Sequence, residues 1–318
     1  IQTAELDIPE NSGSAFFCYG FAWGINNGLL DRDLFEKPMV KAWKELTQYV
    51  NKEGRLGYVQ PVGKDPKPYD KDSWHEFGTG AFLLAASEYM KFLKNPVPKI
   101  PISYNKKNLF YENKFSNSSD INGWLLEGEA EVLIKDSWLE MYSPDQKAHH
   151  VFWCPKELPS DFMAEWELQN INPDAGLCIV FFAAKGINGK DVMHPSLMKR
   201  NGVFRQYTQS DLNNYHISYY ANNPKKPNRP FAHIRKNKGF VTVQYGEQGI
   251  PASSTFVHKV NLVKKENHIT MTIDGREIIN WKDDGNKYGP VLQEGKFAFR
   301  QMQWSHFRYR NFKVWNIN

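Results

Sequence analysis

Cysteine and long apolar runs are both scarce in this chain, and each scarcity removes a class of protein. The three cysteines, Cys18, Cys154 and Cys178, lack the spacing of metal ligands and allow at most one disulfide. Cys154 and Cys178 stand in apolar runs, so we expect them to be small buried residues. No apolar run approaches the roughly 20 residues of a membrane span. Phosphate-loop patterns are also absent, so we expect no metal, no cofactor and no membrane insertion.

Aromatic residues, in contrast, are abundant, with 10 Trp, 15 Tyr and 21 Phe. Such an excess fits a β-rich core and also fits stacking on sugar rings, and composition does not separate the two. Charge is unevenly divided, because residues 1–94 carry a net −2 and residues 95–318 a net +7. The basic residues are spread among predicted strands and form no nucleic-acid-binding motif. We therefore expect an anionic polysaccharide as partner and no nucleic acid.

The spacing of apolar residues changes near residue 95 and predicts two structural parts. Helical spacing runs through residues 14–50, in two helices, and returns over residues 79–93. Prolines in the stretch 95–101 end the last helix, and beyond residue 108 the period becomes two. We expect a helical segment over 1–94, a proline-rich linker over 95–107, and a mainly β jelly-roll sandwich over 108–318.

The stretch Asp211–Tyr220 combines two amides, a histidine and three tyrosines in what otherwise reads as a strand. Because side chains alternate between the two faces of a strand, we expect His216 and Tyr220 on one face. A row of imidazole and phenol groups is useful where protons move, so His216 and Tyr220 are candidate catalytic residues, and Tyr207 is a third because it lies on the preceding predicted strand and could approach His216 more closely. The alternative is that each is an ordinary structural residue of its strand.

Two arginines occupy predicted strand positions that suit the binding of carboxylate or sulfate. Arg205 shares a face with Tyr207 in a strand predicted over residues 203–207. Arg235 shares a face with Asn237 in the same way. A guanidinium group binds a carboxylate through two parallel hydrogen bonds, which is the geometry that a uronic acid would require.

Arg300 follows two phenylalanines in an apolar strand, and an arginine in such a place needs a carboxylate partner. Asp211 and Glu165 are the candidates for that partner. The remaining residues that we expect to contact a sugar are Asn214, His150 and Trp153.

Two pairs of carboxylates raise further alternatives. Glu165 and Glu167 share a strand face roughly 6.5 Å apart, close to the separation in retaining glycosidases. A glycoside hydrolase that uses these two residues therefore stays an alternative. Asp283 and Asp284 predict a turn that offers two carboxylates to calcium, which is too few for a calcium site on its own.

The first part of the chain resembles the C-terminal portion of the unsaturated rhamnogalacturonyl hydrolases. The matching motifs are Glu10–Ser14, Gly24–Asp31, Gly57–Gly63 and Gly78–Ala85. That family folds as an (α/α)6 barrel and removes unsaturated uronic acids from oligosaccharides. Its catalytic aspartate lies upstream of the matched stretch, so the resemblance implies a partial barrel without hydrolase activity.

The second part is similar to a galectin-like family that bacteria encode beside rhamnogalacturonan-degrading enzymes. The resemblance covers residues 108–318 and implies a concanavalin-like jelly roll. The matching motifs include Val151–Pro155, Ala164–Glu167, Gly176–Gly186, Gly202–Tyr220 and Phe299–Gln303.

The two parts together resemble the oligosaccharide dehydratases of ulvan utilisation. The implied reaction is a carbon–oxygen elimination that removes water across C4–C5 of a non-reducing-end uronic acid on a sulfated rhamnose. We expect such a lyase to be periplasmic or secreted, with its signal peptide removed before residue 1. A non-catalytic module that binds acidic polysaccharide is the main alternative, and the oligomeric state stays open.

Overall fold

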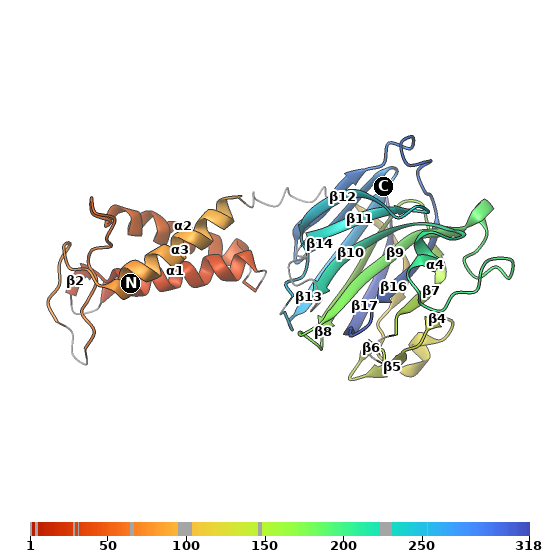
Figure 1. Cartoon of the computed structure of the whole chain (residues 1–318), viewed down its shortest axis with the longest axis horizontal. Helices are drawn as coiled ribbons and strands as arrows, with labels where there is room; N and C mark the ends of the chain where they lie inside the picture. Colours follow the sequence, from red (N-terminus) through yellow and green to blue (C-terminus); the bar gives the residue numbers. More distant parts are fainter. Residues whose placement is uncertain are drawn as a thin grey trace. The chain divides into compact units, whose positions relative to one another are not determined.

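The structure is a computed structural model that describes residues 2–3, 6–27, 29–30, 32–63, 67–94, 104–145, 148–222, 231–252 and 254–318. It contains two compact units, Ile1–Val97 and Pro98–Asn318, each with a hydrophobic core of its own (Figure 1). Most of the predicted linker over 95–107 lies outside the described residues. Within the described part, no helix is long and apolar enough to cross a membrane.

The first unit is built from three helices, as the helical spacing predicts. They are α1 (Asn11–Asn26), α2 (Arg32–Gln48) and α3 (Glu76–Lys94), preceded by β1 (Gln2–Thr3) and β2 (Leu6–Pro9). The Glu10 carboxylate caps α1, because it accepts hydrogen bonds from the backbone N–H groups of Ser12 and Gly13 at 3.2 and 2.9 Å. Trp43 of α2 stacks on Phe82 of α3 at 5.3 Å between ring centres, which holds these two helices together.

The second unit is a sandwich of two antiparallel sheets, which confirms the predicted fold class (Figure 1). The first sheet has seven strands in the order β12-β11-β10-β9-β16-β7-β4. The second has eight, in the order β15-β14-β13-β8-β17-β6-β5 with β3 also paired to β17. The strands are β3 (Lys106–Asn113), β4 (Leu125–Gly128), β5 (Glu131–Lys135), β6 (Trp138–Tyr142), β7 (His150–Leu158), β8 (Phe162–Asn170), β9 (Gly176–Gly186), β10 (Leu212–Asn222), β11 (Phe231–Asn237), β12 (Val241–Gln248), β13 (Val257–Lys265), β14 (His268–Ile273), β15 (Arg276–Lys282), β16 (Gly295–Gln301) and β17 (His306–Ile317).

Aromatic side chains from the inner faces of both sheets form one core. Trp166 of β8 packs edge-on against Phe297 and Phe299 of β16, each at 5.7 Å between ring centres. Cys154 and Cys178 are buried in the same core, as expected from their apolar surroundings. Full burial of a large apolar side chain stabilises a fold by roughly 1.5–3 kcal/mol relative to exposure, so this core is the main support of the sandwich.

Strand β10 departs from simple alternation near its C-terminal end. Tyr215 faces the core and His216 faces outward, as expected. The register of β10 against β9 then shifts between Ser218 and Tyr220, which is the signature of a β-bulge. Tyr220 consequently points into the core, where its hydroxyl donates a hydrogen bond to the Ala252 carbonyl at 2.6 Å. The expectation that Tyr220 shares a face with His216 is therefore wrong.

The prediction of a strand over residues 203–207 is also wrong. Residues Arg205–Thr208 form the short helix α4 in the connection between β9 and β10. Tyr207 is buried and Arg205 is exposed, so the two do not share a face. Tyr207 and Phe204 are held by packing onto the sheet below them, and such tertiary contacts override a local period-two pattern.

Candidate functional site

A buried histidine and a buried arginine lie on the outer face of the seven-stranded sheet, one on each side of strand β9. β10 and β16 both pair with β9. His216 of β10 lies opposite Phe181, and Arg300 of β16 lies opposite Ile179. Phe181 and Ile179 are two positions apart on β9, so both polar side chains leave the sheet on the same face. Both are fully buried.

Residues 187–211, between β9 and β10, cover this face, and Phe204 of this covering segment contacts both polar groups. The centre of its ring lies 4.2 Å from Cζ of Arg300 and 5.4 Å from the centre of the His216 ring. Gly202, two residues before Phe204, packs so closely on the His149 backbone that a Cβ there would lie 1.9 Å from the His149 carbonyl oxygen, and its φ of +91° also favours glycine. The covering segment therefore shields Arg300 and His216 from solvent.

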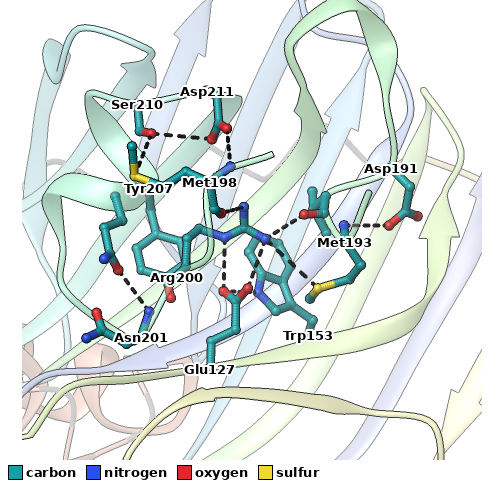
Figure 2. A network of polar contacts seen from close by, with 12 residues as sticks. Glu127, Trp153, Asp191, Met193, Met198, Arg200, Asn201, Tyr207, Ser210 and Asp211 are labelled. Atoms are coloured by element: carbon teal, nitrogen blue, oxygen red, sulfur yellow. Dashed lines mark hydrogen bonds and ion pairs between the residues drawn. The ribbon is translucent and has the colours of Figure 1, made fainter. Parts of the chain in front are cut away.

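Glu127 of β4 ties the covering segment to the sheet (Figure 2). Its carboxylate accepts hydrogen bonds from the Arg200 guanidinium at 2.8 and 3.2 Å and from the Trp153 indole N–H at 2.9 Å. Arg200 in turn donates to the carbonyl groups of Val192 and Met198 in its own segment. The Arg200 and Glu127 side chains are only 3% and 12% exposed. Because a bidentate ion pair is geometrically specific, this pair fixes where the segment sits.

Trp153 and Tyr207 fill the space between the covering segment and the sheet. Both stack on Phe181, with ring centres 6.0 and 5.6 Å away. The Tyr207 hydroxyl accepts a hydrogen bond from the Gly202 N–H at 3.0 Å, and burial together with Glu127 raises the pKa of Tyr207. Trp153 is 1% exposed and its indole is held by Glu127, so it packs beneath the covering segment, and its contact with a sugar stays a prediction.

Arg300 has no carboxylate partner in the part of the chain that the structure describes. Its Nε and Nη1 have no hydrogen-bond partner there, and its Nη2 donates only to the Gly202 carbonyl at 3.4 Å. Burial lowers the pKa of Arg300 to about 9. A buried cation without a counter-ion is costly to a fold. Its unused N–H donors therefore mark a position where an anion would be stabilised.

The two carboxylates expected to pair with Arg300 are engaged elsewhere, so that prediction is wrong. Asp211 accepts the Met198 backbone N–H at 2.6 Å, within the covering segment. Glu165 lies on the outer face of the opposite sheet and pairs with Lys106 at 2.6 Å. The strand period placed Arg300 correctly but gave no information on which distant carboxylate would reach it.

His149 and His150 lie next to Arg300. The His149 ring accepts the Gln303 backbone N–H at 3.1 Å through Nδ1. Burial, and after it the charge of Arg300, lowers the pKa of His149 to about 4 and that of His150 to about 3. Both rings are therefore neutral at pH 7. His150 is fully buried and shares the inner face of β7 with Phe152, which contradicts its expected contact with a sugar.

Two buried amides connect the Tyr207 backbone to His216. Asn214 Nδ2 donates to the Tyr207 carbonyl oxygen at 2.8 Å. Asn237 Nδ2 lies 2.8 Å from Asn214 Oδ1 and 2.8 Å from His216 Nδ1. We expected both amides to bind sugar, but these hydrogen bonds are made within the protein and orient His216 instead.

Arg235 does share the outer face with Asn237, as the strand period predicts. It lies directly opposite His216 in the pairing of β10 with β11. Its guanidinium donates to Thr242 at 2.9 Å and lies 4.2 Å from the centre of the Phe240 ring. Arg235 is half-buried, so it extends the cationic character of the site toward β12, whereas the exposed Arg205 lies apart from these contacts.

A pocket of about 480 Å³ opens beside the Glu127–Arg200 pair. Glu127, Arg200, His149, Asn201 and Val203 are among its lining residues. Gly202, whose carbonyl faces Arg300, lies between the last two in the chain. The pocket is therefore adjacent to the buried site, and the backbone of the covering segment separates them.

The two carboxylates of the glycosidase alternative lie on the outer face of the eight-stranded sheet. Glu165 pairs with Lys106, and Glu167 pairs with Arg310 at 2.7 Å. Each is neutralised by its own cation, on the sheet that does not carry Arg300 and His216. The geometry thus gives no support to a nucleophile and acid pair at these positions.

The turn predicted at Asp283 and Asp284 is anchored in the fold by the Asp283 carboxylate. Asp283 is fully buried and binds Lys236 at 2.6 Å, and it also accepts the Tyr215 hydroxyl. Among the described residues, no group of three or more His, Cys, Asp or Glu side chains is placed to hold a metal.

A second group of polar side chains, Ser254, His258 and Asp274, is connected by hydrogen bonds in the order of the serine–histidine–aspartate triad of hydrolases. Ser254 Oγ lies 2.7 Å from His258 Nε2, and His258 Nδ1 lies 2.6 Å from Asp274 Oδ2. Ser254 is 3% exposed, and its oxygen also receives the Phe256 backbone N–H at 3.4 Å. These contacts fasten the connection before β13 to the turn between β14 and β15, which is a structural role.

Sequence reasoning missed Glu127, Arg200 and Phe204, which complete the site. Glu127 lies in β4, a four-residue strand too short to show a period. Its partner Arg200 is 73 positions away in the chain, in a segment without regular spacing. Phe204 falls inside the matched stretch 202–220, which was the one available signal for it.

Comparisons with known proteins match both parts of the chain. Residues 108–314 match the family described as domain of unknown function DUF1961, and residues 2–93 match glycosyl hydrolase family 88. The uncharacterized protein YesU of Bacillus subtilis is 35% identical over 215 residues, which are 66% of this chain and 97% of YesU. A crystal structure of a Bacillus subtilis protein of unknown function with a galectin-like fold superposes with a TM-score of 0.65 at 33% identity, and the match covers 68% of this chain and 99% of that one.

The helical segment has relatives of a different kind. The unsaturated 3S-rhamnoglycuronyl hydrolase of Formosa agariphila is 52% identical over 85 residues, which are 27% of this chain. The same residues are only 22% of that hydrolase, so this chain spans about a fifth of its length. Both resemblances expected from the sequence motifs are confirmed.

Proposed function

The chain belongs to the family described as domain of unknown function DUF1961, and we propose that its sandwich is a carbon–oxygen lyase. Its substrate is an acidic oligosaccharide of the ulvan type, in which a uronic acid ends a chain that contains sulfated rhamnose. The reaction removes water across C4–C5 of the terminal uronic acid and leaves an unsaturated uronic acid. We place the activity in the periplasm or outside the cell.

One observation carries this proposal, namely the fully buried Arg300 without a carboxylate partner among the described residues. A guanidinium with unused donors in a desolvated site binds a carboxylate far better than one exposed to water. His216 lies across β9 from it, on the same face. A place for a carboxylate next to a group that handles protons is what an elimination from a uronate requires.

The chemistry gives each part a task. Removing the C5 proton of a uronate is difficult, because negative charge develops on its carboxylate, and Arg300 neutralises that charge. A base takes the C5 proton, the C4–O bond breaks as the C4–C5 double bond forms, and an acid protonates the departing oxygen to give water. His216 and Tyr207 are the candidate residues for these proton steps, whereas Tyr220 lies in the core and has no part in them.

The relatives of the helical segment add support of a different kind. The Formosa agariphila relative is by name a hydrolase of unsaturated 3S-rhamnoglycuronyl groups. An elimination such as the one proposed would produce a group of that class. The presence of both family matches in one chain therefore fits a role in the breakdown of a single type of saccharide.

The test is to incubate the protein with saturated uronate–rhamnose oligosaccharides and to follow ultraviolet absorbance, since the C4–C5 double bond conjugates with the carboxylate. We expect absorbance to rise, and mass spectrometry to show the loss of one water without chain cleavage. Arg300→Leu should abolish the rise. Arg205→Leu removes the same charge from an exposed position and should leave it unchanged.

Two other outcomes are informative. Chain cleavage together with rising absorbance would indicate a polysaccharide lyase instead of a dehydratase. Binding of the oligosaccharides without any change in absorbance or mass would overturn the lyase and leave a carbohydrate-binding module.

A further inference from the structure

The amide of Asn237 is held in one orientation by a chain of hydrogen bonds that begins at the Tyr207 backbone. A carbonyl oxygen only accepts hydrogen bonds, so the Asn214 group that faces the Tyr207 carbonyl must be its NH2 group. The oxygen of Asn214 then faces Asn237, at 2.8 Å. It requires a donor there, so Asn237 presents its own NH2 group on that side.

The same NH2 group of Asn237 determines the protonation of His216. It lies 2.8 Å from His216 Nδ1, so Nδ1 must accept a hydrogen bond and carries no proton. In a neutral imidazole the proton is then on Nε2. The doubly protonated ring would place an Nδ1–H against an amide N–H, which is a contact between two donors. The two amides thus favour one neutral tautomer of His216.

We propose that His216 is a neutral hydrogen-bond donor to the substrate carboxylate, held in this state by Asn214 and Asn237 as positioning residues. This assignment rests on the proposed function and refines it. Because Nδ1 accepts the Asn237 amide and Nε2 already carries the proton, neither ring nitrogen is available to take a proton, so His216 acts beside Arg300 on the carboxylate. Tyr207, whose hydroxyl also interacts with Glu127, is then the candidate for the acid that protonates the departing oxygen.

The placement of the two residues supports a shared ligand. His216 and Arg300 leave the sheet on the same face, two positions apart along the strand between them. The ring of Phe204 contacts both, with its centre 4.2 Å from Arg300 Cζ and 5.4 Å from the centre of the His216 ring. A carboxylate that displaced this ring would meet a cationic donor on one side and a neutral donor on the other.

The first experiment is nitrogen-15 NMR of the full-length protein labelled at histidine, because a protonated and an unprotonated ring nitrogen differ widely in chemical shift. We expect His216, assigned through His216→Gln, to show an unprotonated Nδ1 and a protonated Nε2 at neutral pH. An Nδ1–H tautomer or a doubly protonated ring would overturn the proposal.

The hydrogen bonds that run from the Tyr207 carbonyl through Asn214 and Asn237 to His216 form a relay. The second experiment reverses the last of these hydrogen bonds with Asn237→Asp. A carboxylate at this position accepts a hydrogen bond from Nδ1–H, so the proton should move to Nδ1 and Nε2 should become an acceptor. The NMR pattern of His216 should reverse, and the affinity for a saturated uronate oligosaccharide should fall ten- to hundredfold, as for one lost hydrogen bond to a charged group. Asn213→Asp adds the same charge outside the relay and should change neither quantity.

The two proposals fail separately. If the tautomer is as stated and the oligosaccharide binds without elimination, the lyase is overturned and the donor role of His216 stands. If elimination occurs while His216 carries its proton on Nδ1, the lyase stands and the relay is overturned. Unchanged oligosaccharide affinity in Asn237→Asp, with the tautomer reversed, would show that His216 does not contact the carboxylate.

Discussion

The phenyl ring of Phe204 lies over the guanidinium of Arg300, with 4.2 Å between the ring centre and Cζ. Such a cation–π contact partly compensates a buried charge and is worth about 2 kcal/mol when desolvated. Phe204 belongs to the covering segment, so the group that shields Arg300 sits on the part of the sandwich whose position depends on the Glu127–Arg200 pair.

Removing this ring should expose Arg300. In Phe204→Ala we expect the arginine-selective reagent phenylglyoxal to modify Arg300 readily, whereas the fully buried residue of the unaltered protein resists it. Peptide mass spectrometry after modification identifies the site. Phe256→Ala is the matched control, because Phe256 is exposed, precedes β13 of the other sheet and should leave Arg300 protected. Equal modification of Arg300 in the two variants would show that Phe204 does not control access.

Glu127 should be important for stability as well as position. Glu127→Ala leaves the nearly buried Arg200 without its carboxylate and removes the acceptor of the Trp153 indole. Loss of one partner of a buried ion pair costs about 3–5 kcal/mol. Urea unfolding followed by tryptophan fluorescence should show a clearly lower midpoint. Glu129→Ala, at a neighbouring pocket residue, should stay near the unaltered protein, and a similar midpoint in both variants would contradict this account.

Stability should fall in acid because the half-buried His149 and the buried His150 resist protonation. The pKa values of His149 and His150 in the folded protein are about 4 and about 3, below the value of about 6.5 of an unfolded chain. At pH values between these folded and unfolded pKa values, the unfolded state binds more protons than the folded state. The free energy of unfolding therefore decreases as pH falls from about 6.5 toward 3. Thermal unfolding at a series of pH values measures this slope.

A variant separates the two causes of these low pKa values. Arg300→Leu removes a nearby positive charge but leaves much of the burial, so the pKa of His149 should rise and the acid sensitivity should weaken. NMR titration of the His149 ring gives the pKa directly. An unchanged pKa would mean that burial alone sets it.

Gly202 should tolerate no side chain. A Cβ at this position would lie 1.9 Å from the His149 carbonyl oxygen, at φ +91°. Gly202→Ala therefore forces the covering segment off the sheet, and we expect destabilisation well beyond the roughly 1–2 kcal/mol of a left-handed residue alone. Gly189→Ala provides the comparison, because Gly189 also has positive φ but no atom within 4 Å of its added Cβ. Equal loss of stability in the two variants would argue against the close approach.

Much of the sandwich was predictable from its own residues. Period-two spacing beyond residue 108 predicted the sandwich, because strands such as β6 and β14 turn one apolar face to the core. The same spacing placed Arg235 and Asn237 on one face and set His216 apart from Tyr215. These properties depend on neighbours along the chain, which is the information that a strand pattern contains.

The bulge in β10 and the helix α4 were not predictable in this way. Tyr220 turns inward because β10 and β9 pair with a shifted register, and register is a property of two strands. Tyr207 and Phe204 pack onto side chains of the sheet beneath them, and this packing outweighs the local spacing that predicted a strand. The buried state of Trp153 follows from the same segment, which closes over the sheet.

The sequence by itself determined the two-part organisation, the jelly-roll class, the family resemblances and the presence of His216 and Arg300 on strands. Only the tertiary structure decided that these two share a face, that Arg300 lacks a carboxylate among the described residues, and that Glu127 holds Arg200. The physical reason is that faces and periods arise from local backbone geometry. The pairing of charges depends on which distant segments are brought together, and in this protein the partners are separated by as many as 73 positions.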